Sequence, residues 1–291
     1  MSLSPDLAKA RLFCFGLGYS ARRVVGQVGS VAGTYRSAKP IGVAAFPFSR
    51  DRPLAKDGLA ALVRATHLLI SIPPDRDGDG VLAIHAAALR AAADLRWIGY
   101  LSTTGVYGDT GGAWVDETAP LKPTSDRSRW RVEAEAAWLA FGRDTGKAVQ
   151  VFRLAGIYGP GRSVFDRIAA GEARRIDKPD HLFSRIHVDD IARALIRSMA
   201  APRPGAVWNV CDDEPATQAD VIAHACRLLG REPPPLVPFA EAAPKMSPMA
   251  LSFWRDNRRV DNRKIKRELG GEFIHPNYRA GLKAILGGES S

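Results

Sequence analysis

A short apolar run followed at once by two closely spaced glycines constrains the fold of this chain more than any other feature. The run is RLFCF at 11–15, and GLGYSA at 16–21 leads into a helical segment at 21–28. The first glycine would allow a tight turn, the second would let the backbone approach a pyrophosphate, and the final alanine allows close helix packing. Glycines can also simply mark a turn, but the strand–turn–helix context favours a dinucleotide site. Its contacts are expected from Gly16, Gly18, Tyr19, Ser20 and Ala21.

The same alternation of strand and helix continues over about two hundred residues. Apolar runs that predict strands lie at 31–35, 41–48, 66–72, 97–102, 148–154 and 207–210. Helical segments separate most of them, which predicts an α/β fold: a Rossmann-type, doubly wound parallel sheet covered on both faces. We expect a nucleotide-binding domain at 1–212, parts of 159–186 reaching into a lobe, and a small substrate-binding lobe at 213–291.

Composition narrows the class of protein. The chain has 291 residues, of which 46% are hydrophobic and 25% charged, as in ordinary globular proteins. No stretch approaches the roughly 20 apolar residues of a membrane span, and the N-terminus shows no signal peptide. Cys14, Cys211 and Cys226 are odd in number and form no CxxC pattern, which argues against disulfides and structural zinc. We therefore expect a cytoplasmic protein without a metal site.

The net charge of +10 and pI near 9.8 have three explanations: nucleic acid, a membrane surface or a phosphorylated ligand. The basic residues are scattered, however, and the densest run, at 255–269, is interrupted by acids as in a solvated helix face. We expect neither nucleic acid nor a membrane as partner.

The end of the second predicted strand favours one cofactor. In NAD sites, an Asp or Glu at this position binds the ribose 2′-hydroxyl. This chain offers Thr34, Tyr35, Arg36 and Ser37 instead, and the guanidinium of Arg36 could pair with a 2′-phosphate. The alternative is a surface arginine that ends a strand. The sequence thus predicts NADP(H), with Arg36, Ser37 and the fourth-strand residues Ser71 and Pro73 beside it.

Several longer motifs resemble those of one family. STTGVYG at 102–108, RLAGIYGPGR at 153–162 and FSRIHVDDIARAL at 183–195 are similar to the extended short-chain dehydrogenases/reductases, the epimerase/dehydratase branch. The resemblance covers almost the whole chain. It implies a Rossmann-type domain plus a C-terminal lobe that often serves nucleotide-sugar substrates.

The family's catalytic set, by contrast, is eroded. Relatives use Ser/Thr with a YxxxK pair, in which the phenolate takes a proton while hydride passes to the nicotinamide. Thr103 matches the Ser/Thr position, but the family spacing places Arg127 at the tyrosine and Arg131 at the lysine. No tyrosine lies between Tyr107 and Tyr158 to restore the motif. The chain therefore resembles the atypical subgroup of the family.

Each replacement has a functional and a structural interpretation. Arginine has a pKa above about 12 and cannot accept a proton at neutral pH. Arg127 could clamp a substrate anion or stabilise an oxyanion, and Arg131 could bind the nicotinamide ribose; the alternative for both is a solvated helix face. Tyr107 is a catalytic candidate or a packing residue. Arg185 is a candidate for a substrate phosphate, although the position that binds pyrophosphate in many relatives is Phe183.

The sequence leaves two functions open. The first is an NADP(H)-dependent oxidoreductase or epimerase acting on a nucleotide-linked, phosphorylated or carboxylated small molecule, and a homodimer is a possible assembly. The second is a catalytically silent NADP-binding sensor or scaffold, which the loss of the tyrosine and lysine suggests.

Overall fold

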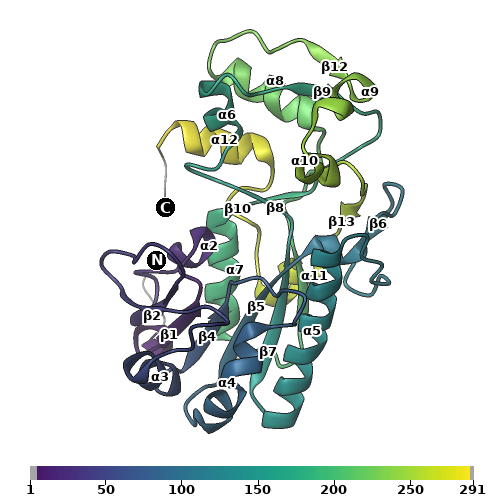
Figure 1. Cartoon of the computed structure of the whole chain (residues 1–291). Helices are drawn as coiled ribbons and strands as arrows, with labels where there is room; N and C mark the ends of the chain where they lie inside the picture. The colour runs from purple at the N-terminus through teal and green to yellow at the C-terminus, as the bar shows by residue number, and fades with distance from the viewer. Residues whose placement is uncertain (1–4, 289–291) are drawn as a thin grey trace. The chain divides into compact units, whose positions relative to one another are not determined.

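The computed structural model describes residues 5–288 (Figure 1). The chain divides into two compact units, each assembled from three segments. The first unit comprises residues 5–103, 125–153 and 191–208, and the second comprises 104–124, 154–190 and 209–288. A boundary between a nucleotide-binding domain and a lobe near residue 212 stays a prediction.

A seven-stranded sheet is the centre of the first unit, with the order β3–β2–β1–β4–β5–β7–β11. All four pairs from β3 to β5 are parallel. The chain order reverses between β1 and β4, the place where such sheets bind nucleotides at their carboxyl edge. The predicted doubly wound parallel sheet is confirmed. The strands are β1 (Arg11–Phe15), β2 (Ser30–Tyr35), β3 (Ala44–Pro47), β4 (His67–Ile70), β5 (Trp97–Thr103), β7 (Ala148–Leu154) and β11 (Val207–Val210).

Helices cover both faces of this sheet, which is why its central strands are apolar along their length. Leu62, Leu89 and Trp138 bring α3, α4 and α5 onto one face in a single apolar core. On the other face lies α7, where the Ser198 hydroxyl accepts a hydrogen bond of 2.8 Å from the Trp97 indole. The helices are α1 (Pro5–Ala8), α2 (Tyr19–Arg22), α3 (Lys56–Val63), α4 (Gly80–Ala91), α5 (Asp126–Thr145) and α7 (Val188–Ala200).

Trp97 and Gly99 share one face of β5. A Cβ atom added at Gly99 would lie 2.2 Å from the Trp97 ring, so the indole fills the space that a side chain at 99 would need. Residues i and i+2 of a strand point to the same side. The large Trp97 ring therefore fits only because residue 99 is a glycine.

The helix after the glycine turn is shorter than the sequence predicts. We expected a helix at 21–28, whereas α2 spans only Tyr19–Arg22. The chain continues in tight turns, in which the amides of Val24 and Val25 bond to carbonyls three residues back. Gly26 then adopts a φ of +84°, a left-handed conformation that ends any helix.

A buried ion pair fastens α5 to the sheet. Arg153 on β7 and Glu135 on α5 are 5% and 3% exposed, and their Nη2 and Oε2 atoms are 2.8 Å apart. The Ser102 hydroxyl at the end of β5 donates to the same carboxylate at 2.5 Å. The glutamate therefore links one helix to two neighbouring strands.

The second unit consists of short elements around two small cores. One core joins α6, α8 and α12 through residues such as Val221, Ala225 and Leu282, and the other surrounds Ile176 and Trp254. The strands pair in twos: β8 (Gly156–Tyr158) with β10 (Arg185–His187), β9 (Arg175–Asp177) with β12 (Leu236–Pro238), and β6 (Trp114–Val115) with β13 (Arg259–Val260). The helices are η1 (Thr104–Tyr107), α6 (Val164–Ala169), α8 (Gln218–Leu228), α9 (Phe239–Ala242), η2 (Ala243–Lys245), α10 (Pro248–Phe253), α11 (Arg263–Leu269) and α12 (Tyr278–Leu286).

The C-terminal part is more regular than its sequence suggests. After the proline-rich stretch near 232–238 the sequence indicates a helix face only at 255–269, where α11 lies, and α12 is a further helix beyond it. In α12 the buried residues Tyr278 and Leu282 are one turn apart and face the core of the unit.

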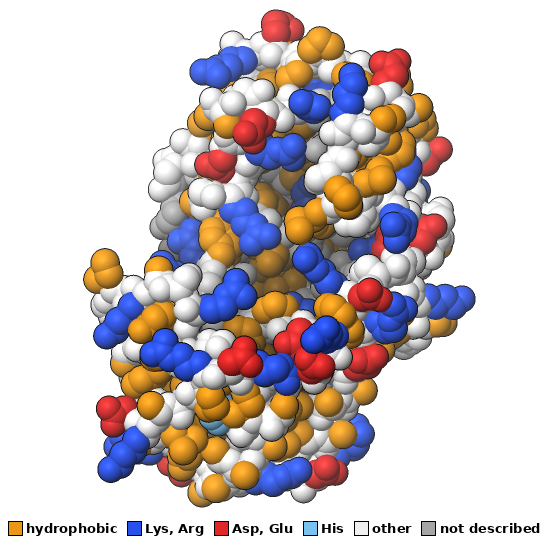
Figure 2. All heavy atoms as spheres, viewed as in Figure 1, with side chains coloured by type: hydrophobic (Ala, Val, Ile, Leu, Met, Phe, Trp, Pro, Cys, Tyr) orange, Lys and Arg blue, Asp and Glu red, His pale blue; other side chains and the backbone are white. Residues whose placement is uncertain are grey.

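Surface charge is mixed. Figure 2 shows basic side chains interspersed with acidic and apolar ones over the visible face, not gathered in one block. Within residues 5–288, no helix combines the length and apolarity needed to cross a bilayer.

Replacing Glu135 by Gln should lower the free energy of unfolding by roughly 3–5 kcal/mol, because the buried Arg153 charge loses its counter-charge. Urea denaturation would measure the change. The exposed pair of Arg129 and Asp126 provides a control: Asp126→Asn should cost less than about 1 kcal/mol. If Glu135→Gln is no more destabilising than this control, the ion pair does not fasten α5.

Candidate functional site

The glycine turn is held in shape by the neighbouring strand β2. Gly16 has a φ of +92°, which L side chains rarely adopt, and its N–H donates to the Thr34 hydroxyl at 2.9 Å. The next amide, of Leu17, donates to the Thr34 carbonyl at 2.9 Å. Thr34 is 2% exposed. A buried threonine thus takes up the first two amides of the turn and fixes its direction.

The surroundings of the two glycines differ. A Cβ at Gly16 would lie 2.8 Å from the Ile72 side chain, whereas a Cβ at Gly18 would have no atom within 4 Å. The amides of Ser71 and Ile72 both donate to the Phe15 carbonyl, which ties the end of β4 to the end of β1. The turn is therefore closed toward β4 and open above Gly18, which is the space a pyrophosphate needs beside this backbone.

The remaining residues predicted at this edge lie around the turn. Ser20 and Ala21 are buried in α2, and Tyr19 is half-buried. Arg36 and Ser37 are exposed directly after β2, and Pro73 is exposed after β4. The edge thus presents a guanidinium and no carboxylate among residues 34–37, as the sequence indicates.

Helix α5 brings Arg131 to the end of β5. Ser125 caps the helix by accepting the Ser128 amide. One Nη1 group of Arg131 donates to the Leu101 carbonyl, and the guanidinium carbon lies 5.8 Å from the centre of the Tyr100 ring. Arg131 is therefore packed against the strand and is not part of a solvated helix face.

Arg127 lies one turn earlier on the same helix and is exposed. Thr103, the last residue of β5, is half-buried and lies two positions beyond Leu101. Because Arg131 bonds Leu101, the start of α5 lies by the carboxyl end of β5. Within the first unit, Thr103 and this arginine pair thus belong to the same edge as Gly16 and Ser71.

Tyr107 belongs to the second unit, in η1. It is 1% exposed, and its hydroxyl donates to the Asn209 Oδ1 atom at 2.7 Å. The Asn209 side chain in turn donates to the Asp261 carbonyl at 3.1 Å. These contacts are those of a packing residue with a satisfied hydroxyl.

Arg185 also lies in the second unit, on β10. Its Nη1 group donates to the carbonyls of Phe183 and Ala216 at 2.8 and 2.9 Å. Nearby Asp212 is 2% exposed, and this burial raises the pKa of its carboxyl to about 8 although the charge of Arg185 acts in the opposite direction. Arg185 and Asp212 thus form a buried polar cluster that no sequence motif predicts.

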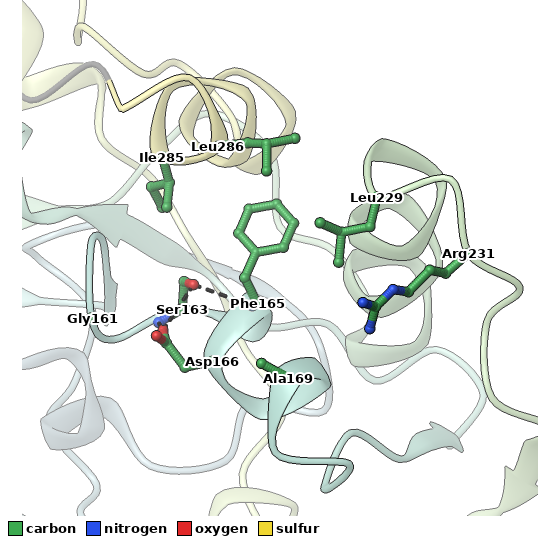
Figure 3. Close-up of a pocket in the computed structure, with 9 residues that line it drawn as sticks. All are labelled: Gly161, Ser163, Phe165, Asp166, Ala169, Leu229, Arg231, Ile285 and Leu286. Atoms are coloured by element: carbon green, nitrogen blue, oxygen red, sulfur yellow. Dashed lines mark hydrogen bonds between the residues drawn. The ribbon is translucent and has the colours of Figure 1, made fainter.

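A surface pocket of about 280 Å³ lies elsewhere in the second unit (Figure 3). Its apolar lining includes Phe165, Leu229 and Ile285, and Asp166 and Arg231 provide charge. None of the residues predicted for cofactor, catalysis or substrate lines it.

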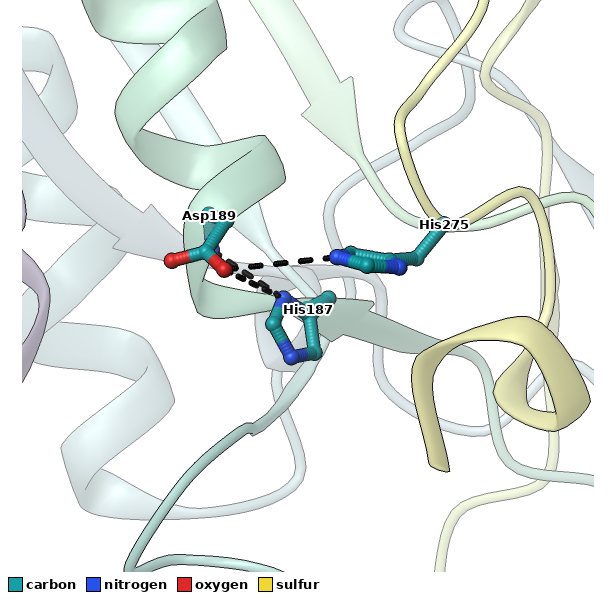
Figure 4. Close-up of side chains that lie close together, drawn as sticks. All are labelled: His187, Asp189 and His275. Atoms are coloured by element: carbon teal, nitrogen blue, oxygen red, sulfur yellow. Dashed lines mark hydrogen bonds and ion pairs between the residues drawn. The ribbon is translucent and has the colours of Figure 1, made fainter. Parts of the chain in front are cut away.

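Three contacts escaped the sequence analysis. The buried Thr34 appeared only as a strand end without an acid, and no contact was predicted for Glu135. The cluster of His187, Asp189 and His275 joins residues far apart in the chain, which no local pattern reveals (Figure 4). For Thr34 and Glu135, the signal in the sequence was a polar residue next to a motif, in a position that the fold buries.

Comparison with known proteins identifies the family. Residues 74–211 match the sequence model of the NAD dependent epimerase/dehydratase family. The chain is 31% identical over 228 residues to Protein YeeZ of Escherichia coli, which covers 76% of each chain. This chain belongs to the epimerase/dehydratase family.

Two further proteins are similar to this chain. A functionally unknown conserved protein from Silicibacter pomeroyi has a solved structure that is 48% identical, with a TM-score of 0.86 over 97% of this chain and 100% of that one. The 3-diazoavenalumate denitrifying reductase of a Streptomyces species is 30% identical over 183 residues, 58% of each chain. The suspected relation to atypical extended short-chain dehydrogenases/reductases is confirmed.

The raised pKa of Asp212 predicts a pH-dependent stability. The folded state keeps this proton at pH values where the unfolded carboxyl, with its ordinary pKa of 3.8, has lost it. This group therefore contributes stability that falls as the pH rises from about 4 to about 8. Asp212→Asn removes the titration. The melting temperature of the variant minus that of the wild type should therefore increase as the pH rises across this range.

Thermal unfolding at a series of pH values would measure this difference. The exposed Asp57→Asn variant should follow the wild-type profile and serves as control. A constant difference between Asp212→Asn and the wild type across this pH range would show that the carboxyl is already ionised in the folded protein.

Proposed function

We propose that this protein is an NADP(H)-dependent oxidoreductase that reduces an anionic small molecule in the cytoplasm. The observation that carries the proposal is the turn at the carboxyl edge of β1, which is open above Gly18 and flanked by Arg36 where an NAD site wants a carboxylate. Membership of the epimerase/dehydratase family supports a nicotinamide dinucleotide at this edge.

The residues of the turn fit such a cofactor. A side chain at Gly18 would project into the open space, so the absence of a Cβ leaves room for a pyrophosphate. The helix α2 has only four residues, and its dipole is correspondingly small. Arg36 would supply the fixed positive charge and pair with a 2′-phosphate, and Ser37, Ser71 and Pro73 would line the remainder.

The chemistry favours reduction over alcohol oxidation. A bound nicotinamide supplies or accepts a hydride. Oxidation of an alcohol also requires a base, and Arg127 at the tyrosine position cannot accept a proton at neutral pH. Reduction needs instead a group that stabilises negative charge as it develops on the acceptor, and a guanidinium does this well. The Streptomyces relative is itself named a reductase.

Three side chains of the first unit would then have distinct roles. Thr103 would donate a hydrogen bond to the acceptor atom of the substrate, and Arg127 would bind its anionic group. Arg131 is held by the Leu101 carbonyl and the Tyr100 ring, so its contribution to the nicotinamide ribose would come from its other N–H groups. The proton that completes the reduction would come from water.

The negative charge of the substrate is inferred from the arginines. Carboxylate and phosphate groups match the planar fork of guanidinium, and Arg127 is exposed at the start of α5. Arg185 uses Nη1 for two backbone carbonyls, so a substrate anion would take the N–H groups on Nε and Nη2. A nucleotide-linked, phosphorylated or carboxylated substrate satisfies this requirement.

One observation favours a second function, a catalytically silent NADP-binding sensor or scaffold. Tyr107, four residues after the family's catalytic threonine, has its hydroxyl engaged by Asn209. If no substrate is ever turned over, the retained fold would serve nucleotide binding alone. Whether the protein works as a homodimer stays a prediction.

Calorimetric titration of NADPH and NADH tests the cofactor. We expect NADPH to bind more tightly, and Arg36→Ala to weaken NADPH by about tenfold to a hundredfold, as for a lost hydrogen bond between charged groups. NADH binding should not change. The exposed Arg64→Ala variant is the control. NADH binding equal to or tighter than that of NADPH would contradict the assignment.

Oxidation of NADPH in the presence of paired anionic and neutral carbonyl compounds tests turnover. Arg127→Ala should lower kcat/KM for anionic substrates by about a hundredfold, since it removes a charged contact worth roughly 1.5–3 kcal/mol, and should leave NADPH affinity unchanged. Arg127→Lys should restore part of the loss. Normal NADPH binding without turnover of any compound would favour the sensor.

A further inference from the structure

The pocket of about 280 Å³ on the second unit has no part in the function proposed above (Figure 3). Three helices surround it with apolar side chains: Phe165 and Ala169 from α6, Leu229 from the end of α8, and Ile285 and Leu286 from α12. An apolar cavity of about 150 Å³ already holds a benzene ring. The pocket is therefore large enough for one ring or a similar alkyl group together with a short chain.

The apolar side chains of this pocket are only partly covered by the protein. Phe165 and Ile285 pack on the small core that contains Ala225 and Leu282, but both remain half-buried. Leu286 is 46% exposed. An apolar group placed among these side chains would remove their surface from water, which is the main favourable term in such binding. The pocket therefore suits a ligand with an apolar body.

The turn that ends α8 brings a cationic side chain to the pocket. Gly230 adopts a φ of +63°, and its N–H donates to the Arg227 carbonyl at 3.1 Å. The Arg231 N–H donates to the Cys226 carbonyl at 2.9 Å. These two bonds form the Schellman arrangement of a helix end, which fixes the direction in which the chain leaves α8. Figure 3 shows the Arg231 guanidinium beside Leu229, pointing toward the side of the pocket that α6 forms.

The charge that this pocket leaves for a ligand is positive. The Asp166 carboxylate turns back to cap α6, where its Oδ2 atom accepts the Ser163 N–H at 2.6 Å and the Ser163 hydroxyl at 3.0 Å. Within residues 5–288, by contrast, the Arg231 side chain has no hydrogen-bond or ion-pair partner. A guanidinium without a partner matches a carboxylate, to which it can donate two parallel N–H···O bonds.

We propose that this pocket binds a small apolar carboxylate, which consists of an aryl or alkyl group and a short chain that ends in the charged group. The apolar body lies among Phe165, Leu229 and Ile285, and the carboxylate faces Arg231. The ligand thus joins α6, α8 and α12, the three helices of one small core. Because no residue proposed for the cofactor, catalysis or the substrate lines the pocket, this ligand binds in addition to them.

Calorimetric titration of the full chain with matched probes tests this proposal. We expect 3-phenylpropionate to bind with a dissociation constant below about 1 mM, as is reasonable for a ligand of this size. The alcohol 3-phenylpropan-1-ol lacks the charge and acetate lacks the apolar body, so each should bind at least about tenfold more weakly. A carboxylate probe that does not bind, or that binds no more tightly than the alcohol or acetate, would overturn the proposal.

A pair of alanine variants locates the apolar part of the ligand. Ala169→Leu should fill the pocket and weaken 3-phenylpropionate by about tenfold or more, since the added side chain occupies the space of the ring. Ala170→Leu is the matched control, because Ala170 is also exposed but lies outside the pocket lining. It should leave the affinity unchanged. Equal affinities of the two variants would show that the probe binds elsewhere.

A pair of arginine variants locates the charged part. Arg231→Gln should weaken 3-phenylpropionate by about tenfold, because a charged contact is lost, and should leave the affinity for the alcohol unchanged. Arg227→Gln alters an exposed arginine of α8 outside the pocket lining and should change neither affinity. Arg127→Ala separates this pocket from the proposed substrate site and should also change neither. An Arg231→Gln variant that still prefers the carboxylate to the alcohol as strongly as the wild type would refute the assignment.

Discussion

The buried ion pair between Glu135 and Arg153 is the interaction on which the arrangement of the first unit depends. It holds the long helix α5 against β5 and β7, and the Ser102 hydroxyl joins it from the end of β5. Ser102 directly precedes Thr103, and Arg131 lies one turn before Glu135. A single carboxylate thus sets the position of both the threonine and the arginine pair that the family pattern places in the active site.

The replacement of tyrosine and lysine by two arginines has unequal consequences. Arg131 lies beside an aromatic ring and a carbonyl oxygen, so its charge is satisfied within the protein. Arg127 is exposed, and its charge is available to a ligand. On this helix, Arg131 therefore packs against the sheet, whereas Arg127 is exposed to solvent. This difference supports reduction of an anion more than the proton abstraction of typical relatives.

Continuous apolar runs made the central sheet predictable. The run at 148–154 corresponds residue for residue to β7, a strand that is buried along its whole length and includes only two polar residues, Gln150 and Arg153. The helix after Gly18 was overestimated because tight turns and Gly26 compete with local helical pattern. The helix α12 was missed because it is short and gains stability from packing, through Tyr278 and Leu282.

The candidate site was predictable only where chemistry follows from position in a motif. Gly16 and Gly18 predict a turn at a strand end, and the family spacing placed Arg131 at the lysine position. Spacing could not reveal that its partner is the Leu101 carbonyl, nor that His187 would meet His275, because such contacts depend on the tertiary fold.

The tryptophan that lies over Gly99 has a consequence for how this lineage can vary. Any side chain at 99 would collide with the indole, and removing the indole alone would leave an empty volume under α7 and remove the bond that the Ser198 hydroxyl accepts, although this hydroxyl still donates to Gln150. Drift at these two positions must therefore be concerted: homologues that lose the large ring should carry a larger residue two places later.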